Sequence, residues 1–343
     1  MRSGEFYQHH LDAVSRSFAL CIPQLDQPFR ERVALSYLLL RVLDTVEDAP
    51  FDDKRQQEKQ FTRFRRFLRE LPSAAEVEEF KSSFPASLTP GERALLVDTH
   101  AFFEDAHSLP ASARIVIVDV IDRMAEGMAT YARRPQPLRL VDLEDVTRYC
   151  CIVAGLVGEL LTRLWALGHV SAPTMALAYR FGVYLQKVNI LKDQEEDEDA
   201  GRFLVPDRRE LLASLRADAE GALAYLRALP RDARGYRIFC AWSLMMGAQS
   251  LDIMDGPKQS HRSQTAKLLA RTAAIAQDDH ALARLFSELL PDLPETSPRA
   301  PIAKPESAEQ FRDLLAAPLT DSEFQALGIF LGGAEPLARA ASQ

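Results

Sequence analysis

The sequence predicts an all-α protein. Glycine is scarce, at 15 of 343 residues, or about 4% against a typical ~7%. Strict alternation of apolar and polar residues, which would indicate strands, is hard to find, whereas apolar residues recur at helical spacing over most of the chain. An apolar content of 47% is enough to bury a large core, so the bulk of the chain is expected to fold.

The individual helices follow from the apolar pattern. A helix is predicted from Phe29 to Asp44, and its apolar residues are so dense that it should be buried. The run Ile115 to Val118 could form a strand, but the pattern continues at helical spacing to Met128 and favours a helix. Further helices, with ends marked by polar caps and prolines, are expected at roughly 55–71, 91–107, 140–167, 172–199, 207–228, 231–254, 263–291 and 307–317.

Proline marks the predicted domain boundary. Five of the twenty prolines lie between Pro291 and Pro305, where a helix cannot continue. We therefore predict a main domain over residues 1–290, a linker over 291–306, and a tail over 307–343 with one short helix. The N-terminus has no apolar core of a secretory signal, and the charge-free run Phe324 to Ala334 is about half the length of a membrane-spanning helix. No transmembrane anchor is expected.

Charge and cysteine content narrow the function classes. The chain has 49 acidic and 41 basic residues, and its net charge of −8 disfavours binding to the phosphate backbone of nucleic acids. Four cysteines are too few and too irregularly spaced for a disulfide framework or a CxxC metal site. They favour a reducing compartment. We therefore expect a cytoplasmic protein with no nucleic-acid partner.

Two acidic clusters of the form D-x-x-E-D each follow an apolar helix. They consist of Asp44, Glu47 and Asp48, and of Asp193, Glu196 and Asp197. Carboxylates at i, i+3 and i+4 share one helix face about 5–6 Å apart, and two charges at 5 Å repel by roughly 3 kcal/mol at an effective dielectric of 20. Some cation should offset this repulsion. Oxygen ligands favour Mg²⁺, which binds carboxylates together with substrate phosphates, so two opposed clusters could hold a diphosphate.

A solvated surface is the alternative interpretation of these acidic runs. A run such as Asp193 to Asp199 is usually an exposed helix face. The first cluster is less easily explained in this way, because Asp44 follows an almost unbroken apolar helix. The recurrence of the same pattern after a second apolar helix favours the metal site.

Four segments, in order along the chain, resemble the squalene/phytoene synthase family of head-to-head prenyl synthases, and within it the squalene synthases. They are Ser15–Phe18, Tyr37–Asp48, Tyr149–Gly158 and Leu185–Asp193. The resemblance implies an isoprenoid-synthase fold whose helices surround a central active-site cavity. It also implies two farnesyl diphosphate substrates, an apolar product that would favour peripheral contact with a membrane, and Mg²⁺ and NADPH as cofactors.

The resemblance assigns roles to individual residues. The two acidic clusters would bind Mg²⁺, and Tyr37 and Tyr149 would join Asp44, Asp48, Asp193 and Asp197 in catalysis. Substrate contacts would come from Arg16, Ser17, Phe18, Arg41, Ala154, Gly155, Val157, Gln186, Asn189 and Arg202. The cofactor NADPH would contact Asn189, Phe239 and Arg262.

The implied reaction has two halves. Metal ions stabilise the leaving diphosphate, and the double bond of the second substrate attacks the allylic cation to give presqualene diphosphate. Hydride from NADPH then gives squalene, a precursor for sterol or hopanoid biosynthesis, whereas dehydrosqualene and phytoene synthases lose a proton instead. The segment Phe239–Met245, with Gln186 and Asn189, favours the squalene branch.

Two departures and two alternatives remain. Lys192 stands where squalene synthases usually have arginine, and Arg262 lacks the neighbouring basic residues of the family's cofactor site. The alternatives are a dehydrosqualene- or phytoene-type synthase and a non-catalytic helical scaffold that binds a metal or a partner.

Tyrosines in apolar stripes, such as Tyr37 and Tyr149, are also common core residues. Gly155 and Gly158, inside a predicted helix, require close approach by another helix or by a prenyl chain.

Overall fold

The computed structural model describes residues 1–293 apart from 52, 169, 171, 254–261 and 291. Almost all regular structure within these residues is helical, so the predicted all-α class is confirmed. The chain divides into two compact units, Met1–Arg134 with Arg163–Leu167, and Pro135–Thr162 with the residues from Gly168 onward. Except for residues 292 and 293, the predicted linker and tail lie outside the described residues.

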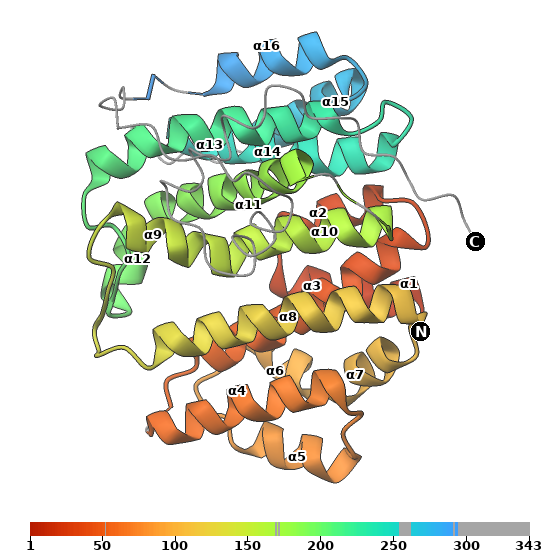
Figure 1. Cartoon of the computed structure of the whole chain (residues 1–343), viewed down its shortest axis with the longest axis vertical. Coiled ribbons are helices and arrows are strands. Elements are labelled where there is room, and N and C mark those ends of the chain that lie inside the picture. Colours follow the sequence, from red (N-terminus) through yellow and green to blue (C-terminus); the bar gives the residue numbers. More distant parts are fainter. Residues whose placement is uncertain (52, 169, 171, 254–261, 291, 294–343) are drawn as a thin grey trace. The chain divides into compact units, whose positions relative to one another are not determined.

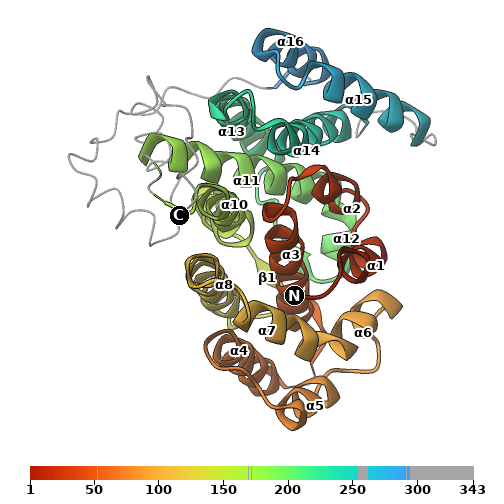
Figure 2. The same cartoon turned by 90° about the vertical axis from the view of Figure 1, so that its right-hand side faces the viewer.

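The first unit is organised around a central helix. Its elements are α1 (Gly4–Val14), α2 (Phe18–Cys21), the 3₁₀ turn η1 (Ile22–Gln24), α3 (Phe29–Asp48), α4 (Lys54–Arg69), α5 (Ala74–Ser82), α6 (Pro90–Val97), α7 (Thr99–His107) and α8 (Ala111–Ala132). The helix α3 packs against α1, α4, α6, α7 and α8, and Figure 2 shows it between α1 and α8. Neighbours on so many sides explain its dense apolar sequence. The helical interpretation of Ile115–Val118 is confirmed by α8.

The second unit is built around α11. Its elements are β1 (Leu138–Arg139), α9 (Leu143–Cys150), a π-helical turn (Cys151–Gly155), most of α10 (Leu156–Ala166), α11 (Ala172–Lys192), α12 (Gln194–Asp199), β2 (Arg202–Phe203), α13 (Arg208–Ala228), α14 (Arg234–Ile253), α15 (Arg262–Ile275) and α16 (Asp279–Leu289). Figure 1 shows α11 beside α13 and α14, against which it packs. The strands β1 and β2 pair in parallel, with Leu138 opposite Arg202.

Glycines allow α10 and α11 to approach closely. A Cβ atom at Gly158 would overlap the carbonyl oxygen of Ala178, and one at Gly182 would overlap that of Ala154. A Cβ at Gly155 would lie 2.8 Å from the ring of Tyr179. Of the two partners that the sequence left open for Gly155 and Gly158, the structure therefore provides the neighbouring helix.

Several predicted helices are interrupted in the structure. The predicted helix 91–107 is two helices that meet at Asp98, and the helix predicted for 172–199 is broken at Asp193. The π-helical turn interrupts the helix predicted for 140–167. The apolar span Leu143–Ala166 has the length and hydropathy of a membrane-crossing helix, but 78% of its 18-residue apolar window is buried within the protein, as in the core helix of a folded domain.

A buried arginine ends α13. The Arg237 side chain is 0% exposed, and its Nη1 donates to the carbonyls of Leu226 and Leu229 at 3.0 and 2.7 Å. Its Nε donates to Ala276 and its Nη2 to Asp279. The carbonyls of Leu226 and Leu229 lie at the end of α13, where carbonyl groups lack intrahelical donors, so one side chain satisfies the end of the helix and joins it to α14 and α16.

Candidate active site

The first acidic cluster lies on one face of α3. Tyr37, Arg41, Asp44 and Asp48 follow one another at intervals of three or four residues, so they share this face. Arg41 Nη1 donates to Asp44 Oδ2 at 2.8 Å. Burial would lower the pKa of Arg41, but the negative charges of Asp44 and Asp48 outweigh it and the pKa is raised. This guanidinium remains charged beside the cluster.

The segment after α1 folds onto the same face. Ser15 Oγ accepts the N–H of Phe18 at 3.0 Å, and the Phe18 and Tyr37 rings lie 5.2 Å apart. Burial raises the pKa of Tyr37, while a hydrogen bond with Ser15 opposes the rise. Arg16 and Ser17 are exposed and Phe18 is half-buried. The structure thus brings together Phe18, Tyr37 and Arg41, which the sequence predicted as site residues.

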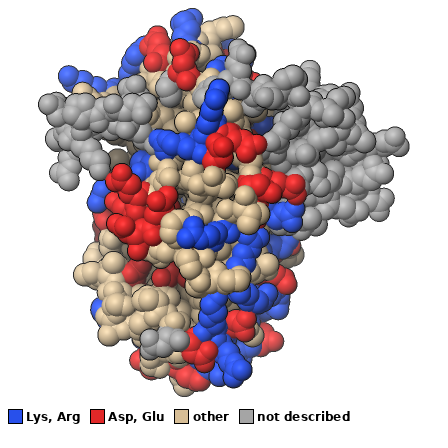
Figure 3. All heavy atoms as spheres, turned by 90° about the vertical axis from the view of Figure 1, so that its left-hand side faces the viewer, with Lys and Arg blue, Asp and Glu red and all other residues tan. Residues whose placement is uncertain are grey.

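The second acidic cluster lies where α11 gives way to α12. Asp193 is the residue before α12, and the Asp197 N–H donates to its carbonyl at 2.9 Å, so the two still lie one turn apart. Arg202, placed by β2, donates from both Nε and Nη2 to Asp197 Oδ1, at 3.1 and 2.6 Å. Lys192 Nζ lies 3.2 Å from Asp193. Figure 3 shows the face that lies on the left-hand side of Figure 1, and on this face acidic side chains gather beside basic ones.

Basic side chains supply the cations that the sequence required. Asp44, Asp193 and Asp197 each have an arginine or lysine partner. Within the described ranges, no group of three or more His, Cys, Asp or Glu side chains is arranged to hold a metal ion. The carboxylate oxygens nevertheless fit the donor preference of Mg²⁺, which keeps several waters and uses few protein ligands.

One accessible stripe of α11 carries the predicted polar residues. From Thr174 onward almost every side chain of this helix is buried, whereas Gln186 is half-buried and Asn189 is exposed. These two positions and Asp193 are three and four residues apart, so they lie on one face. A buried helix therefore presents its predicted substrate and metal residues along a single line.

The π-helical turn shapes a second accessible stripe. Tyr149 in α9 is buried, whereas Ala154 and Val157 are half-exposed in a span that is otherwise largely buried. Gly155 is buried against Tyr179. A π-turn widens a helix locally and is frequent at functional sites. Of the four predicted residues in this span, Ala154 and Val157 are the two whose surface remains open.

The predicted cofactor residues lie in different surroundings. Asn189 is exposed on α11. Phe239 is only 1% exposed and its ring packs against Tyr236, so it lies in the core of the second unit. Arg262 begins α15, but its side chain lies outside the described part of the chain.

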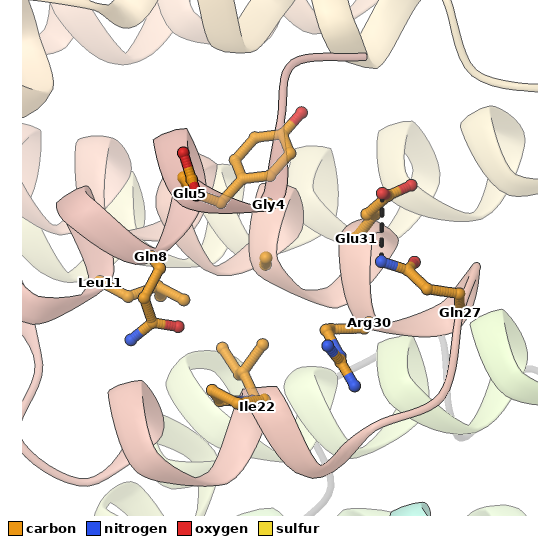
Figure 4. A pocket seen from close by; sticks show the side chains of 11 residues that line it. Gly4, Glu5, Gln8, Leu11, Ile22, Gln27, Arg30 and Glu31 are labelled. Carbon is orange, nitrogen blue, oxygen red and sulfur yellow. Dashed lines mark hydrogen bonds between the residues drawn. The ribbon is translucent and has the colours of Figure 1, made fainter.

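A pocket of about 250 Å³ lies in the first unit between α1, η1 and α3 (Figure 4). Apolar Leu11, Ile22 and Ala34 line it together with polar Gln8 and Arg30. Residues 30, 34 and 37 follow helical spacing, so the pocket touches the face of α3 that also carries Tyr37. This face therefore runs from the pocket, past a tyrosine and an arginine, to the acidic cluster.

A buried charged group was missed at the sequence level. Asp218 of α13 pairs with Arg180 and Lys187 of α11, at 3.2 and 2.8 Å, and Lys187 Nζ also donates to Ser214 at 2.9 Å. All three charged side chains are buried. Lys187 lies next to Gln186, so this group sets the rotation of the helix that carries the second cluster. A lysine inside the largely apolar segment 176–191 was the available signal.

The squalene/phytoene synthase family model matches residues 11–209, more than half of the chain. This chain belongs to the squalene/phytoene synthase family. The match spans all four segments that carry the resemblance, which is thereby confirmed. Both acidic clusters and Arg202 lie within it.

Individual relatives are squalene synthases. That of Schizosaccharomyces pombe is 36% identical over 208 residues, which cover 57% of this chain and 42% of that protein. That of Rattus norvegicus is 32% identical over 201 residues, which cover 57% of this chain and 45% of that protein. The chain thus matches less than half the length of these relatives.

Solved structures agree in fold. A complex of TcSQS with a ligand has a TM-score of 0.68 at 23% identity, and the match covers 95% of this chain and 98% of that one. A dehydrosqualene synthase in complex with a ligand has a TM-score of 0.53 at 20% identity, covering 79% and 95%. At these identities the likeness concerns the fold alone.

Proposed function

We propose that this protein is a squalene synthase, which condenses two farnesyl diphosphates through presqualene diphosphate and reduces the intermediate with NADPH. The observation that carries the proposal is the pair of D-x-x-E-D clusters, each beside a basic side chain: Arg41 in the first unit and Arg202 in the second. Family membership supports it.

Each basic side chain has a defined task in this proposal. Arg41 and Arg202 would turn from their aspartate partners to the oxygens of a diphosphate, which is a stronger bidentate acceptor than a single carboxylate oxygen. Mg²⁺, when bound by the carboxylates, would neutralise the charge that develops on the leaving diphosphate. Once Arg41 and Arg202 have turned to the diphosphate, the carboxylates of Asp44 and Asp197 would be available to bind Mg²⁺.

Apolar and aromatic side chains would contact the prenyl chain of the substrate. Phe18 packs against Tyr37, which lies one helix turn before Arg41, and Ala154 and Val157 offer apolar surface in the second unit. Such walls exclude water, which would otherwise capture the allylic cation. The raised pKa of Tyr37 keeps its phenol neutral, so that its oxygen can orient or accept a proton without adding a negative charge.

A dehydrosqualene-type synthase is the second candidate. It is favoured by the burial of Phe239, which leaves little surface for a nicotinamide ring, and by the fold shared with a dehydrosqualene synthase. This candidate needs the same Mg²⁺ and diphosphate residues but no reductant. It therefore differs from the first only in the product.

Product analysis separates the candidates. The protein is incubated with farnesyl diphosphate and Mg²⁺, with and without NADPH, and the extracted hydrocarbons are identified by mass spectrometry. We expect squalene only when NADPH is present and presqualene diphosphate without it. Dehydrosqualene under both conditions would replace the first candidate by the second, and no condensation in either would overturn both.

A further inference from the structure

Two carbonyl groups at the end of α3 lack their usual donors. The carbonyl of Val46 would accept the N–H four residues later, but that residue is Pro50, which has none. The carbonyl of Glu47 would accept the N–H of Phe51, which donates to Ala49 instead, at 2.9 Å. The unsupported turn is the one that carries Glu47 and Asp48.

Gln57, in the first turn of α4, supplies both missing bonds. Its Nε2 donates to the carbonyl of Glu47 at 2.7 Å and to that of Val46 at 3.0 Å. We propose that Gln57 is a positioning residue, which holds the end of α3 so that Glu47 and Asp48 can bind a divalent cation. This inference rests on the proposed function of the first acidic cluster.

Electrostatics at this end of α3 make the support necessary. A helix carries about half a negative charge at its C-terminus, where acidic side chains are unfavourable. The last turn of α3 contains Glu47 and Asp48 and no basic residue. The two N–H groups of the Gln57 side-chain amide point at the terminal carbonyls of α3 and reduce the local excess of negative charge. Without them, this turn would unwind more readily and its carboxylates would spread apart.

The neighbouring glutamine provides a matched control. Gln56 lies in the same turn of α4, is half-buried like Gln57, and also donates to a backbone carbonyl, that of Ser83, at 2.7 Å. Its bond joins α4 to the end of α5, away from the acidic cluster. Replacing either glutamine by methionine keeps the length of the side chain and removes the donor.

Hydrogen exchange of the metal-free protein tests the positioning directly. In Gln57→Met we expect the amides of residues 46–49 and 51 to exchange on the order of tenfold faster, as expected for the loss of two hydrogen bonds. Gln56→Met should leave this segment unchanged, and Gln57→Lys, which keeps a donor, should restore much of the protection. Equal exchange in all variants, or a lysine variant that behaves like methionine, would overturn the proposal.

Calorimetry with Mg²⁺ and inorganic diphosphate supplies the second measurement. We expect Gln57→Met to bind this pair several-fold more weakly and Gln56→Met to bind it like the native protein, with similar melting temperatures. Unchanged affinity in Gln57→Met would overturn the metal-positioning role. These measurements need no prenyl substrate, so an absence of condensation activity would refute the proposed function without affecting the exchange result.

Discussion

Single basic side chains pair with the carboxylates of the two acidic clusters. The exposure of each carboxylate determines how much its substitution would destabilise the protein. Asp48 is exposed at the last residue of α3, where neither packing nor the helix dipole favours its charge. Asp197, by contrast, is buried and accepts two bonds from Arg202. A neutral side chain should therefore be tolerated structurally at Asp48.

We expect Asp48→Asn to lower turnover by roughly a hundredfold or more, as for loss of a group that stabilises transition-state charge, with little change in stability. Rates with farnesyl diphosphate and a thermal melt check both parts. Glu195→Gln is the control, because Glu195 is an exposed carboxylate at one of the x positions of the second D-x-x-E-D cluster. Collapse of the Asp48→Asn melt would assign this carboxylate a structural role, and full activity would favour the non-catalytic scaffold.

His10 makes stability depend on pH. Burial lowers its pKa from 6.5, and nearby Asp98, 3.0 Å from Nε2, only partly opposes the shift. His10 therefore binds a proton more readily in the unfolded chain than in the folded one. Its contribution to the free energy of unfolding is fully present above pH 6.5 and is lost as the pH falls below that value. Carboxylates with lowered pKa values, such as Asp122, act at lower pH, because their unfolded value is 3.8.

Urea denaturation at pH 7.5 and pH 5.5 measures this contribution. We expect the native protein to lose stability over the interval and His10→Gln to lose less. His9→Gln is the control, because His9 is exposed on the same helix. An identical pH dependence in the native protein and His10→Gln would refute the assignment.

Arg237 and Arg231 show how position decides the value of an ion pair to Asp279. Arg237 is 0% exposed and makes three further bonds to carbonyls, whereas the Arg231 side chain is 73% exposed and lies 3.4 Å from the same carboxylate. We expect Arg237→Met to destabilise the protein by about 3 kcal/mol and Arg231→Met by less than about 0.5 kcal/mol. Denaturant midpoints compare the two, and equal effects would contradict the capping role.

The approach of α10 to α11 yields a packing prediction. Alanine at Gly158 would bring a methyl group onto the carbonyl of Ala178, and overpacking of this kind costs about 1–3 kcal/mol even after the helix-propensity gain. Gly4→Ala is the control, because nothing lies within 4 Å of the Cβ position there. A thermal melt should separate the two variants, and a neutral Gly158→Ala would mean that the helices can move apart.

Helices could be predicted from sequence where the signal is local and long. The apolar density of α3 and the extended pattern of α8 identified both. The breaks at Asp98 and Asp193 were missed, because a polar residue between two periodic segments does not interrupt the period. The strands β1 and β2 have two residues each, too few to show alternation, and α5 was overlooked although Ser73 and Glu76 form its capping box.

The candidate site also has parts that the sequence predicts and parts that only the structure reveals. Within the first cluster, Arg41, Asp44 and Asp48 follow one another at intervals of three or four residues, so the proximity of each to the next follows from spacing. The partners of Gln57 and Lys187 lie on other helices, and only the folded chain reveals them. Pro50 was a readable sign that the end of α3 needed an outside donor, although it did not identify Gln57.

For the whole molecule, we predict that removal of divalent metal ions affects activity and not the fold. Because arginine and lysine pair with the aspartates, chelation should abolish condensation and leave the fold intact. We expect EDTA to leave the melting temperature nearly unchanged, and Mg²⁺ with inorganic diphosphate to raise it by mass action. Unfolding in EDTA would instead identify a structural metal. Asp193→Ala, which removes one ligand, should lose most of the rise.

The break at Asp193 separates two kinds of anchorage within one cluster. Asp193 is attached to α11, which the buried charges of Arg180, Lys187 and Asp218 tie to α13. Glu196 and Asp197 belong to a six-residue helix tied to β2 through Arg202. A cation held across this joint would have one stiff ligand and two compliant ones. Under the proposed function, the second cluster would therefore adjust to a bound cation at Glu196 and Asp197, while Asp193 and the core stay in place.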